Sequence, residues 1–204
     1  QFGFMGFFIV KPEHRDKGMG GQLWLTMRDT LKARLKPDTA IGIDGVFAMQ
    51  QSYAKTGFVF SHRNLRMEGV AESKFENTED GATISPFAAD DIESLMDADA
   101  RWFGCKRQRF LSAWLHMKDS HSLVYKTATE ILGYGTIRPC QNGFKIGPLF
   151  AARAEIADQL YLALTAKVAG QLVYLDVPEI NNEAMALAAK HKLSGSFGCA
   201  RMSL

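Results

Sequence analysis

The chain has little cysteine, little excess charge and no long apolar run. Its three cysteines, Cys105, Cys140 and Cys199, are odd in number and far apart, which excludes a disulfide framework and a CxxC metal site. Few, scattered cysteines suit a reducing compartment, so we expect a cytoplasmic protein without a bound metal. No stretch reaches the roughly 18 apolar residues that a membrane-spanning helix needs, so we expect no membrane segment.

Positive and negative charges nearly cancel, with 24 Lys and Arg against 22 Asp and Glu, a formal net charge of +2. This balance gives no basis for nucleic-acid binding through bulk electrostatics, so no nucleic-acid partner is expected. Apolar residues make up 47% and charged residues 23% of the chain, which is typical of a folded protein with a core. A length of 204 residues allows one or two domains.

The chain opens with a short apolar run, residues 2–10, which is rich in aromatic side chains and ends at Lys11-Pro12. The run predicts a buried β-strand, and it lacks the basic start and cleavage site of a signal peptide. A strand buried on both faces needs neighbours, and none precedes it. We therefore expect a fragment whose missing strands come from the second half or from a second copy in a homodimer. The alternative is a processed N-terminus with ordinary pairing inside the chain.

A glycine-containing turn and a helix follow this strand. The helical spacing is carried by Leu23, Trp24, Met27, Leu31 and Leu35, and Pro37 ends it. A helix N-terminus offers unpaired backbone N–H groups and partial positive charge. Gly18, Gly20 and Gly21 let an anion approach the backbone closely, and Arg15 and Lys17 add cationic donors. The arrangement predicts a site for a phosphate or a pyrophosphate.

Common nucleotide motifs do not fit this turn. The pattern GxxxxGK[ST] is absent, and GxGxxG fails because Leu23 stands at the third glycine position. Residues 10–20 instead match Val-x-Pro-x-x-Arg-x-x-Gly-x-Gly. This pattern resembles the coenzyme A pyrophosphate loop of the GNAT superfamily of N-acyltransferases. The resemblance implies an α/β (α+β) fold with a mixed, mostly antiparallel central sheet flanked by helices.

The resemblance also implies a function. It implies that acetyl-CoA is the cofactor and that an acetyl group passes to the primary amine of a small-molecule or peptide acceptor. The coenzyme contacts that the resemblance implies are Phe8, Ile9, Val10, Arg15, Asp16, Lys17, Gly18, Met19, Gly20 and Gly21.

A second stretch resembles the next strand-helix unit of the same family. A strand over 40–46 precedes a short helix that begins near Phe47 and closes in Tyr-x-Lys-x-Gly-Phe, residues 53–58. The resemblance implies that Tyr53 protonates the departing thiolate, whereas a packing role on an amphipathic helix is the alternative. The family often places an Asn early in this helix to hold the pantetheine arm, and Gln50 or Gln51 is the substitute available here.

We interpret the second half of the chain as a separate unit that is similar to the first. We expect a partial GNAT unit over 1–69 without its first strands, a polar linker over 70–81, and a second GNAT-like unit over 82–204. The motifs around Gly147-Pro148 and Leu175-Asp176 resemble the C-terminal domain of two-domain GNAT proteins. The expected elements of this unit are strands at 82–86, 122–126, 130–138, 143–150, 171–177 and 197–202, and helices at 88–100, 108–117, 154–169 and 182–190.

The second unit departs from the family where a coenzyme would bind. Its turn has no Gly-x-Gly, and Glu155 places a carboxylate in the first turn of the following helix. A carboxylate competes with a pyrophosphate for the same N–H groups, so we expect a degenerate loop that binds coenzyme A poorly. For Asn181 and Asn182 we expect a role as helix caps, and a role in an active site is the alternative. Near Trp102 lies a basic cluster, formed by Lys106, Arg107 and Arg109. It is a candidate contact for an acidic substrate or for the 3′-phosphate of the coenzyme, and a solvated helix start is the alternative.

The general base is not identified by the sequence. Acyl transfer needs a fixed thioester, a stabilised carbonyl oxygen and an uncharged amine. Backbone N–H groups beside Ile9 or Val10 are candidates for the carbonyl. His14 and His62 are candidate bases, although a solvated or packed role suits both better. Asp44 contacts an amine or caps a turn with its glycine neighbour.

Two other functions stay open. One is a non-catalytic GNAT-like module that binds coenzyme A or assembles with a partner. The other is a nucleotide-binding protein that uses the same loop. Neither is excluded by residue spacing, because the loop alone specifies an anion and not a reaction.

Overall fold

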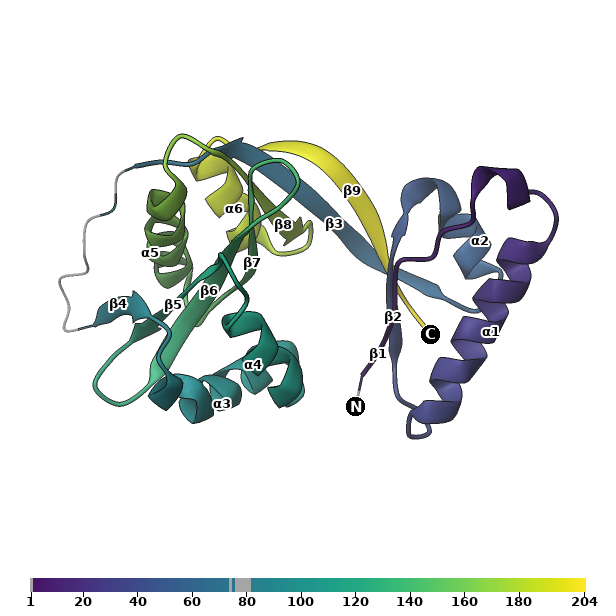
Figure 1. The fold of residues 1–204 in the computed structure, drawn as a ribbon, viewed down its shortest axis with the longest axis horizontal. Helices are drawn as coiled ribbons and strands as arrows, with labels where there is room; N and C mark the ends of the chain where they lie inside the picture. The colour runs from purple at the N-terminus through teal and green to yellow at the C-terminus, as the bar shows by residue number, and fades with distance from the viewer. Residues whose placement is uncertain (1, 74, 76–81) are drawn as a thin grey trace. The chain divides into compact units, whose positions relative to one another are not determined.

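The structure, a computed structural model, describes residues 2–73, 75 and 82–204. The chain divides into two compact units (Figure 1). The first comprises Gln1–Asn64 together with Gly198–Leu204, and the second comprises Leu65–Phe197. Two strands, β3 (Val59–Val70) and β9 (Ser194–Ser203), each contribute residues to both units.

The first unit contains a small sheet and two α-helices. Its further elements are β1 (Gly3–Met5), η1 (Pro12–His14), α1 (Met19–Arg34), β2 (Ile41–Val46), η2 (Phe47–Met49) and α2 (Gln50–Ala54). The strands of this unit follow the order β1-β2-β9-β3. β1 runs parallel to β2, with Gly3 opposite Ile41, and β2 runs antiparallel to β9, with Ile43 opposite Met202. The C-terminal strand therefore completes the sheet of the N-terminal half.

Burial explains why the C-terminus belongs to the first unit. Ala200 is 0% exposed and Met202 is 1% exposed, and both belong to one core with residues from β1, α1 and β2. The other core members are Met5, Trp24, Ile41, Ile43 and Phe58. The observed division thus ends the first unit at residue 64, where the sequence suggested 69, and assigns 198–204 to it, where the sequence suggested the second unit.

The expectation of a buried strand over 2–10 is wrong beyond Met5. β1 alternates, because Gly3 and Met5 face the core while Phe4 is 45% exposed. Phe7 has a positive φ of 54°, so the extended conformation cannot continue through it, and its side chain is fully exposed. Ile9 is 75% exposed. An aromatic, apolar composition therefore misled the sequence analysis, because the backbone leaves the strand after three residues.

The second unit is a larger, mostly antiparallel sheet. Its strands follow the order β9-β3-β8-β7-β6-β5-β4, and β7 and β8 form the one parallel pair whose register is described. Its further elements are β4 (Thr83–Pro86), η3 (Ala89–Asp91), α3 (Ile92–Phe103), α4 (Gln108–Leu115), β5 (His121–Lys126), β6 (Ile131–Pro139), β7 (Phe144–Ala151), α5 (Ala154–Thr165), η4 (Ala166–Val168), β8 (Leu172–Pro178) and α6 (Asn182–Lys190).

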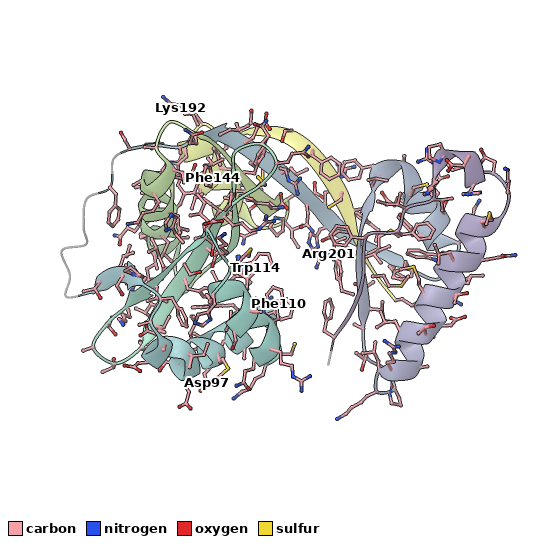
Figure 2. The ribbon with its side chains drawn as sticks, viewed as in Figure 1. Asp97, Phe110, Trp114, Phe144, Lys192 and Arg201 are labelled. Carbon is pink, nitrogen blue, oxygen red and sulfur yellow. The ribbon has the colours of Figure 1, made fainter. Side chains whose placement is uncertain are left out.

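Helices cover both faces of this sheet. Leu123 and Tyr125 belong to the core that holds α5 and α6, whereas Val124 between them belongs to the core that holds α3 and α4. This alternation is the two-residue period of a β-strand. On α4, Phe110 and Trp114 stack with ring centroids 5.2 Å apart (Figure 2). The predicted fold class, a mixed and mostly antiparallel sheet flanked by helices, is confirmed.

Close packing of α5 onto the sheet depends on two glycines of β6. A Cβ at Gly133 would lie 2.9 Å from side-chain atoms of Ile156 and Leu160, and one at Gly135 would lie 2.8 Å from Leu164. The expected helices and strands of this half match the observed ones to within a few residues, apart from 88–100, which begins as η3. The expected linker over 70–81 falls largely outside the described residues. Every helix in the described part of the chain is too short or too polar to cross a membrane.

Shortening Met202 to Ala should destabilise the first unit by about 2–5 kcal/mol, because it opens a cavity in a fully buried site. Ser203→Ala, on the exposed face of the same strand, is the matched control and should change the free energy of unfolding little. Hydrogen-exchange mass spectrometry of peptides from β2 and α1 measures the effect locally. Equal protection in both variants would show that β9 does not support this core.

Candidate functional site

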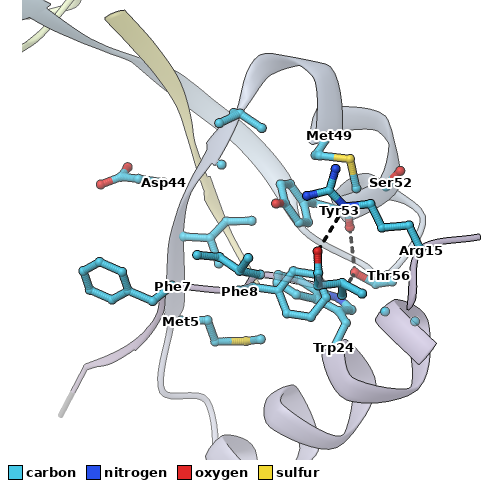
Figure 3. A pocket seen from close by; sticks show the side chains of 18 of the residues that line it. Met5, Phe7, Phe8, Arg15, Trp24, Asp44, Met49, Ser52, Tyr53 and Thr56 are labelled. Atoms are coloured by element: carbon cyan, nitrogen blue, oxygen red, sulfur yellow. Dashed lines mark hydrogen bonds between the residues drawn. The ribbon is translucent and has the colours of Figure 1, made fainter. Parts of the chain in front are cut away.

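The first unit contains a cavity of about 900 Å³ (Figure 3). Its walls come from β1 and the segment after it, the first turn of α1, the end of β2, and the helical segment around α2. This volume lies in the range of small-molecule and cofactor sites. All of its lining residues belong to the first unit.

One wall of the cavity is the N-terminus of α1. Gly18 caps the helix with a positive φ of 76°, a conformation that glycine adopts without strain. The first backbone bond of the helix runs from Gln22 N to Gly18 O at 3.2 Å, so the N–H groups of the preceding turn have no intrahelical acceptor. The first turn carries no acidic side chain. These N–H groups and the helix dipole favour an anion at this wall.

Glycine keeps this wall open. A Cβ at Gly18 or at Gly21 would meet no atom within 4 Å, and both residues line the cavity. A Cβ at Gly20 would reach ordinary contact distance, 3.4 Å, from a methyl group of Val10. The unfilled space beside the backbone is what a phosphate group needs in order to contact the N–H groups directly.

The loop before α1 is held by its own side chains. Arg15 Nε donates to Val10 O at 3.0 Å, and Lys17 Nζ donates to Glu13 O at 2.7 Å. Arg15 also lines the cavity, whereas Lys17 is exposed and does not belong to the lining. Asp16 lines the cavity with a positive φ of 59°.

Most of the predicted coenzyme contacts are brought together by the fold. Those that line the cavity are Phe8, Ile9, Val10, Arg15, Asp16, Gly18, Gly20 and Gly21. Lys17 and Met19 are outside the lining, and Met19 is 48% exposed.

An aromatic cluster joins α1 to the opposite wall. The ring of Trp24 lies 4.8 Å from that of Tyr53 and 5.5 Å from those of Phe8 and Phe58. Trp24 Nε1 donates to Thr56 Oγ1 at 3.0 Å, and Thr56 Oγ1 donates to Tyr53 O at 2.8 Å. Figure 3 shows Phe8, Trp24 and Tyr53 among the side chains that line the cavity. This network ties the position of the tyrosine to the helix that carries the anion wall.

Tyr53 is the predicted catalytic residue, and it lines the cavity. Its ring lies against the backbone of β2, because a Cβ at Gly45 would collide with the Cε2 and Cδ2 atoms of the ring. Burial raises the pKa of the Tyr53 hydroxyl above its usual value of 10. At neutral pH the group is therefore a neutral phenol that retains its proton.

Asp44 lines the cavity but is already paired. It accepts two hydrogen bonds from Arg201, at 2.6 and 2.9 Å, and one from Asn64 Nδ2 at 2.9 Å. Hydrogen bonding to Asp44 raises the pKa of Arg201, even though burial opposes it. Asp44 lies inside β2, so it caps no turn, and it points to the face opposite Gly45 and Tyr53.

The remaining polar candidates lie elsewhere. His14, His62, Gln50 and Gln51 are all outside the lining of the cavity. His62 Nδ1 lies 2.9 Å from the hydroxyl of its neighbour Ser61. Neither glutamine therefore takes the expected place of the family's asparagine.

Sequence reasoning missed several lining residues on the segment around α2. The cavity side of this segment carries Met49, Ser52, Tyr53 and Thr56. Their spacing of three, one and three residues is that of one helix face. Met49, Ser52 and Thr56 could have been identified from the sequence as the residues on the same helix face as Tyr53. The sequence analysis considered instead the residues next to the expected asparagine.

In the second unit, the sequence candidates have structural partners. Asn181 caps α6, since its side chain accepts from Ala184 N at 3.0 Å. Arg107 forms two hydrogen bonds with buried Asp99, at 2.7 and 2.8 Å. Of the other two basic residues, Lys106 forms an ion pair with Asp97, and Arg109 is exposed. Asn182 is the first residue of α6, and Glu155 lies in the first turn of α5. The described residues hold no group of three or more His, Cys, Asp or Glu placed to bind a metal.

The fold and this site define a class. Residues 95–204 match the model of the acetyltransferase (GNAT) domain family. The chain belongs to this family. The matched range covers most of the second unit and β9, whereas the cavity described above is formed by residues 5–56.

Individual relatives extend the similarity to the first unit. The chain is 26% identical over 182 residues to holothin acyltransferase from Pseudoalteromonas sp. (strain SANK 73390), covering 89% of this chain and 59% of that protein. A solved structure from Pyrococcus horikoshii is 23% identical, with a TM-score of 0.77, over 98% of this chain and 64% of the other. The GCN5-related N-acetyltransferase from Sphaerobacter thermophilus is 17% identical, with a TM-score of 0.68, over 96% and 70%. The chain thus spans about three fifths of the length of the holothin acyltransferase.

Replacing Gly45 by Ala should displace the Tyr53 ring and destabilise the first unit by about 1–3 kcal/mol, the usual cost of overpacking. Gly21→Ala adds the same methyl group to open space and should leave stability unchanged or slightly raised, because alanine favours a helix. Urea unfolding and near-ultraviolet circular dichroism measure both effects. Equal behaviour of the two variants would contradict the close approach of Tyr53 to β2.

Proposed function

We propose that the chain is an acyl-CoA-dependent N-acyltransferase that transfers an acetyl group from acetyl-CoA to a primary amine. Membership of the GNAT family supports acyl transfer. The observation that carries the finer proposal is the cavity itself, which places the open N-terminus of α1 and the protonated Tyr53 around one space. The printed name of the Pseudoalteromonas relative, an acyltransferase, agrees with this class of reaction.

The residues of the anion wall fit a diphosphate. Gly18 and Gly21 leave room beside the backbone, the first turn of α1 has no carboxylate, and Arg15 adds a cation at the same wall. In the proposed complex, the N–H groups from Gly18 to Gly21 would donate to the diphosphate oxygens. The guanidinium of Arg15 would pair with the same group, since arginine binds phosphates bidentately.

Direct transfer to an amine needs fixed reactants, a stabilised carbonyl oxygen, an uncharged amine and a proton donor for the leaving sulfur. Coenzyme A, when bound, supplies the activated thioester. Tyr53 holds its proton at neutral pH and would give it to the sulfur as the C–N bond forms and the C–S bond breaks. The proton that the amine nitrogen loses would pass to solvent, and the Tyr53 phenol would regain its own proton from solvent. Backbone N–H groups of Ile9 and Val10, which lie in the lining beyond the paired residues of β1, would donate to the carbonyl oxygen.

A non-catalytic coenzyme-binding or assembly module is the second candidate. One observation favours it: the described lining of the cavity contains no histidine, and its carboxylates are Asp16, beside the anion wall, and Asp44, which is paired with Arg201. Neither is an obvious base for an amine. Release of free thiol from acetyl-CoA over a panel of primary amines separates the candidates. Tight binding without thiol release for any amine would favour the module.

Gly20→Asp should weaken coenzyme A binding at least about tenfold more than Gly20→Asn does, because only Asp adds a negative charge beside the diphosphate. Both side chains have nearly the same size. Asp in the first turn stabilises a helix, so unfolding cannot explain the loss. Calorimetric titration with coenzyme A measures it, and equal affinities of the two variants would count against a diphosphate at this wall.

Tyr53→Phe should lower kcat by roughly 10²–10⁴-fold, the usual contribution of a general acid, while coenzyme A binds as before. The ring remains, so packing against Trp24 and Gly45 is kept. Because the pKa of Tyr53 is raised, its proton is lost only above pH 10, and the wild-type rate should not fall through this group at neutral or mildly alkaline pH. Thiol-release kinetics measure kcat and KM, and an unchanged kcat would remove Tyr53 from the chemistry.

A further inference from the structure

The cavity of the first unit reaches both faces of its small sheet. Four consecutive residues of β2, Ile43 to Val46, belong to its lining. Successive side chains of a strand project from opposite faces, so a wall made of consecutive residues belongs to both faces. The pairing of β1 with β2 ends at Met5 opposite Ile43, and the cavity lies beyond that last pair. The cavity therefore has a second end, on the face away from α1.

Three lining residues mark this second end: Phe7, Asp44 and Val46. Figure 3 shows Phe7 and Asp44 on one side of β2 and Tyr53 on the other. The alternation of β2 agrees with this view, because Tyr53 packs against Gly45, which stands between Asp44 and Val46. With the diphosphate and the sulfur placed on the side of α1 and Tyr53, the Phe7 end is the space left for the acceptor.

The Phe7 end offers a flat apolar surface. The side chain of Phe7 is fully exposed, and Val46 is 45% exposed. Phe7 also has a positive φ of 54°, a conformation that bulky residues rarely adopt. Such strained residues concentrate at ligand sites, where the surrounding structure holds them. An aromatic ring stacked on Phe7 would bury apolar area and gain ring contacts.

The charges at the Phe7 end are already matched. Asp44 accepts two hydrogen bonds from Arg201, at 2.6 and 2.9 Å, and one from Asn64 at 2.9 Å. These bonds use three of the roughly four lone-pair sites of a carboxylate, so one site remains for an N–H donor. Because Arg201 neutralises Asp44, an ammonium group at this end would lose hydration and gain no free counter-charge from it. The Phe7 end therefore favours an uncharged amine.

Basicity separates the amines that meet this condition from those that do not. An alkyl amine resembles the amine of lysine, so about one molecule in a thousand is uncharged at pH 7.4. An amine attached to an aromatic ring shares its lone pair with the ring and is mostly uncharged at that pH. It can attack without first giving a proton to a base. The ring that lowers its basicity also fits the flat surface of Phe7.

We propose that the acceptor is a weakly basic primary amine carried by a flat ring, an arylamine or a heteroarylamine. The proposal rests on the acyl transfer proposed above and names its acceptor class. The ring would stack on Phe7, and Asp44 would accept a hydrogen bond from the amine. As the C–N bond forms and the C–S bond breaks, the nitrogen loses one proton to solvent and the sulfur takes the proton of Tyr53, which solvent replaces. The products are the N-acylated ring amine and the free thiol.

Thiol release from acetyl-CoA with aniline and with benzylamine tests this class, because both carry a phenyl ring and differ mainly in basicity. At pH 7.4, kcat/KM for total aniline should exceed that for benzylamine at least about tenfold, since uncharged benzylamine is scarce. Between pH 6.5 and 8.5, kcat/KM should stay flat for aniline, because Tyr53 keeps its proton throughout. For benzylamine it should rise about tenfold per pH unit.

A preference for benzylamine, or an aniline rate that rises with pH, overturns the acceptor class and leaves acyl transfer standing. Coenzyme A binding without thiol release from any primary amine overturns the proposed function as well.

Phe7→Ala should raise KM for aniline several-fold to about tenfold, because the acceptor loses its stacking surface, while coenzyme A binds as before. Phe60→Ala is the matched control, since Phe60 is an exposed aromatic residue of the first unit, on β3, outside the lining of the cavity. Steady-state thiol release and calorimetry with coenzyme A measure both variants. An unchanged KM in Phe7→Ala, or an equal rise in both variants, overturns the assignment of Phe7 to the acceptor site.

Discussion

The packing of Trp24 is the contact on which the candidate site depends. It is the buried residue of α1, and its ring meets Phe8, Tyr53 and Phe58 while its indole N–H binds Thr56. One side chain therefore holds the N-terminus of a 16-residue helix against the segment that carries the tyrosine. The contacts of Trp24 therefore place the open N–H groups of the first turn and the Tyr53 phenol at the same cavity. Because aromatic side chains dominate this contact, the geometry rests on apolar burial and ring packing more than on ion pairs.

What the sequence predicted well was local. The glycine-containing segment, the helix after it and the short helix that carries Tyr53 are all encoded within about 15 residues each, where capping and periodicity act. The start of α1 was placed three residues too late, at Gln22, because the apolar spacing begins only at Leu23, whereas the helix begins at Met19 and includes Gly20 and Gly21 in its first turn. The contacts that it could not predict are long-range. Asp44 is paired with Arg201, 157 positions away, and β9 returns to complete the first core. A local pattern states which residues are apolar or charged but not which distant strand will meet them. The same limit explains the error over 2–10, where composition suggested burial and a positive φ at Phe7 ends the strand.

The two units differ in where they place glycines and carboxylates around a strand-to-helix connection. In the first, α1 starts with three glycines nearby, no carboxylate in its first turn, and open space beside its backbone. In the second, α5 follows β7 with Glu155 in its first turn, and glycines are used instead on β6, where they admit α5 closely onto the sheet. Glycine thus serves ligand access in one unit and packing in the other.

The N–H groups at the start of α1 are the centre of this account, and they can be observed one by one. Coenzyme A titrated into the isotope-labelled chain, followed by amide ¹H–¹⁵N spectra, should produce its largest shifts at Gly18, Met19, Gly20 and Gly21, as expected for direct donation to a diphosphate. Pantetheine, which lacks the diphosphate, should leave these four resonances nearly unmoved. If coenzyme A shifts other amides and not these four, or if none shift at saturation, the anion wall does not exist as described.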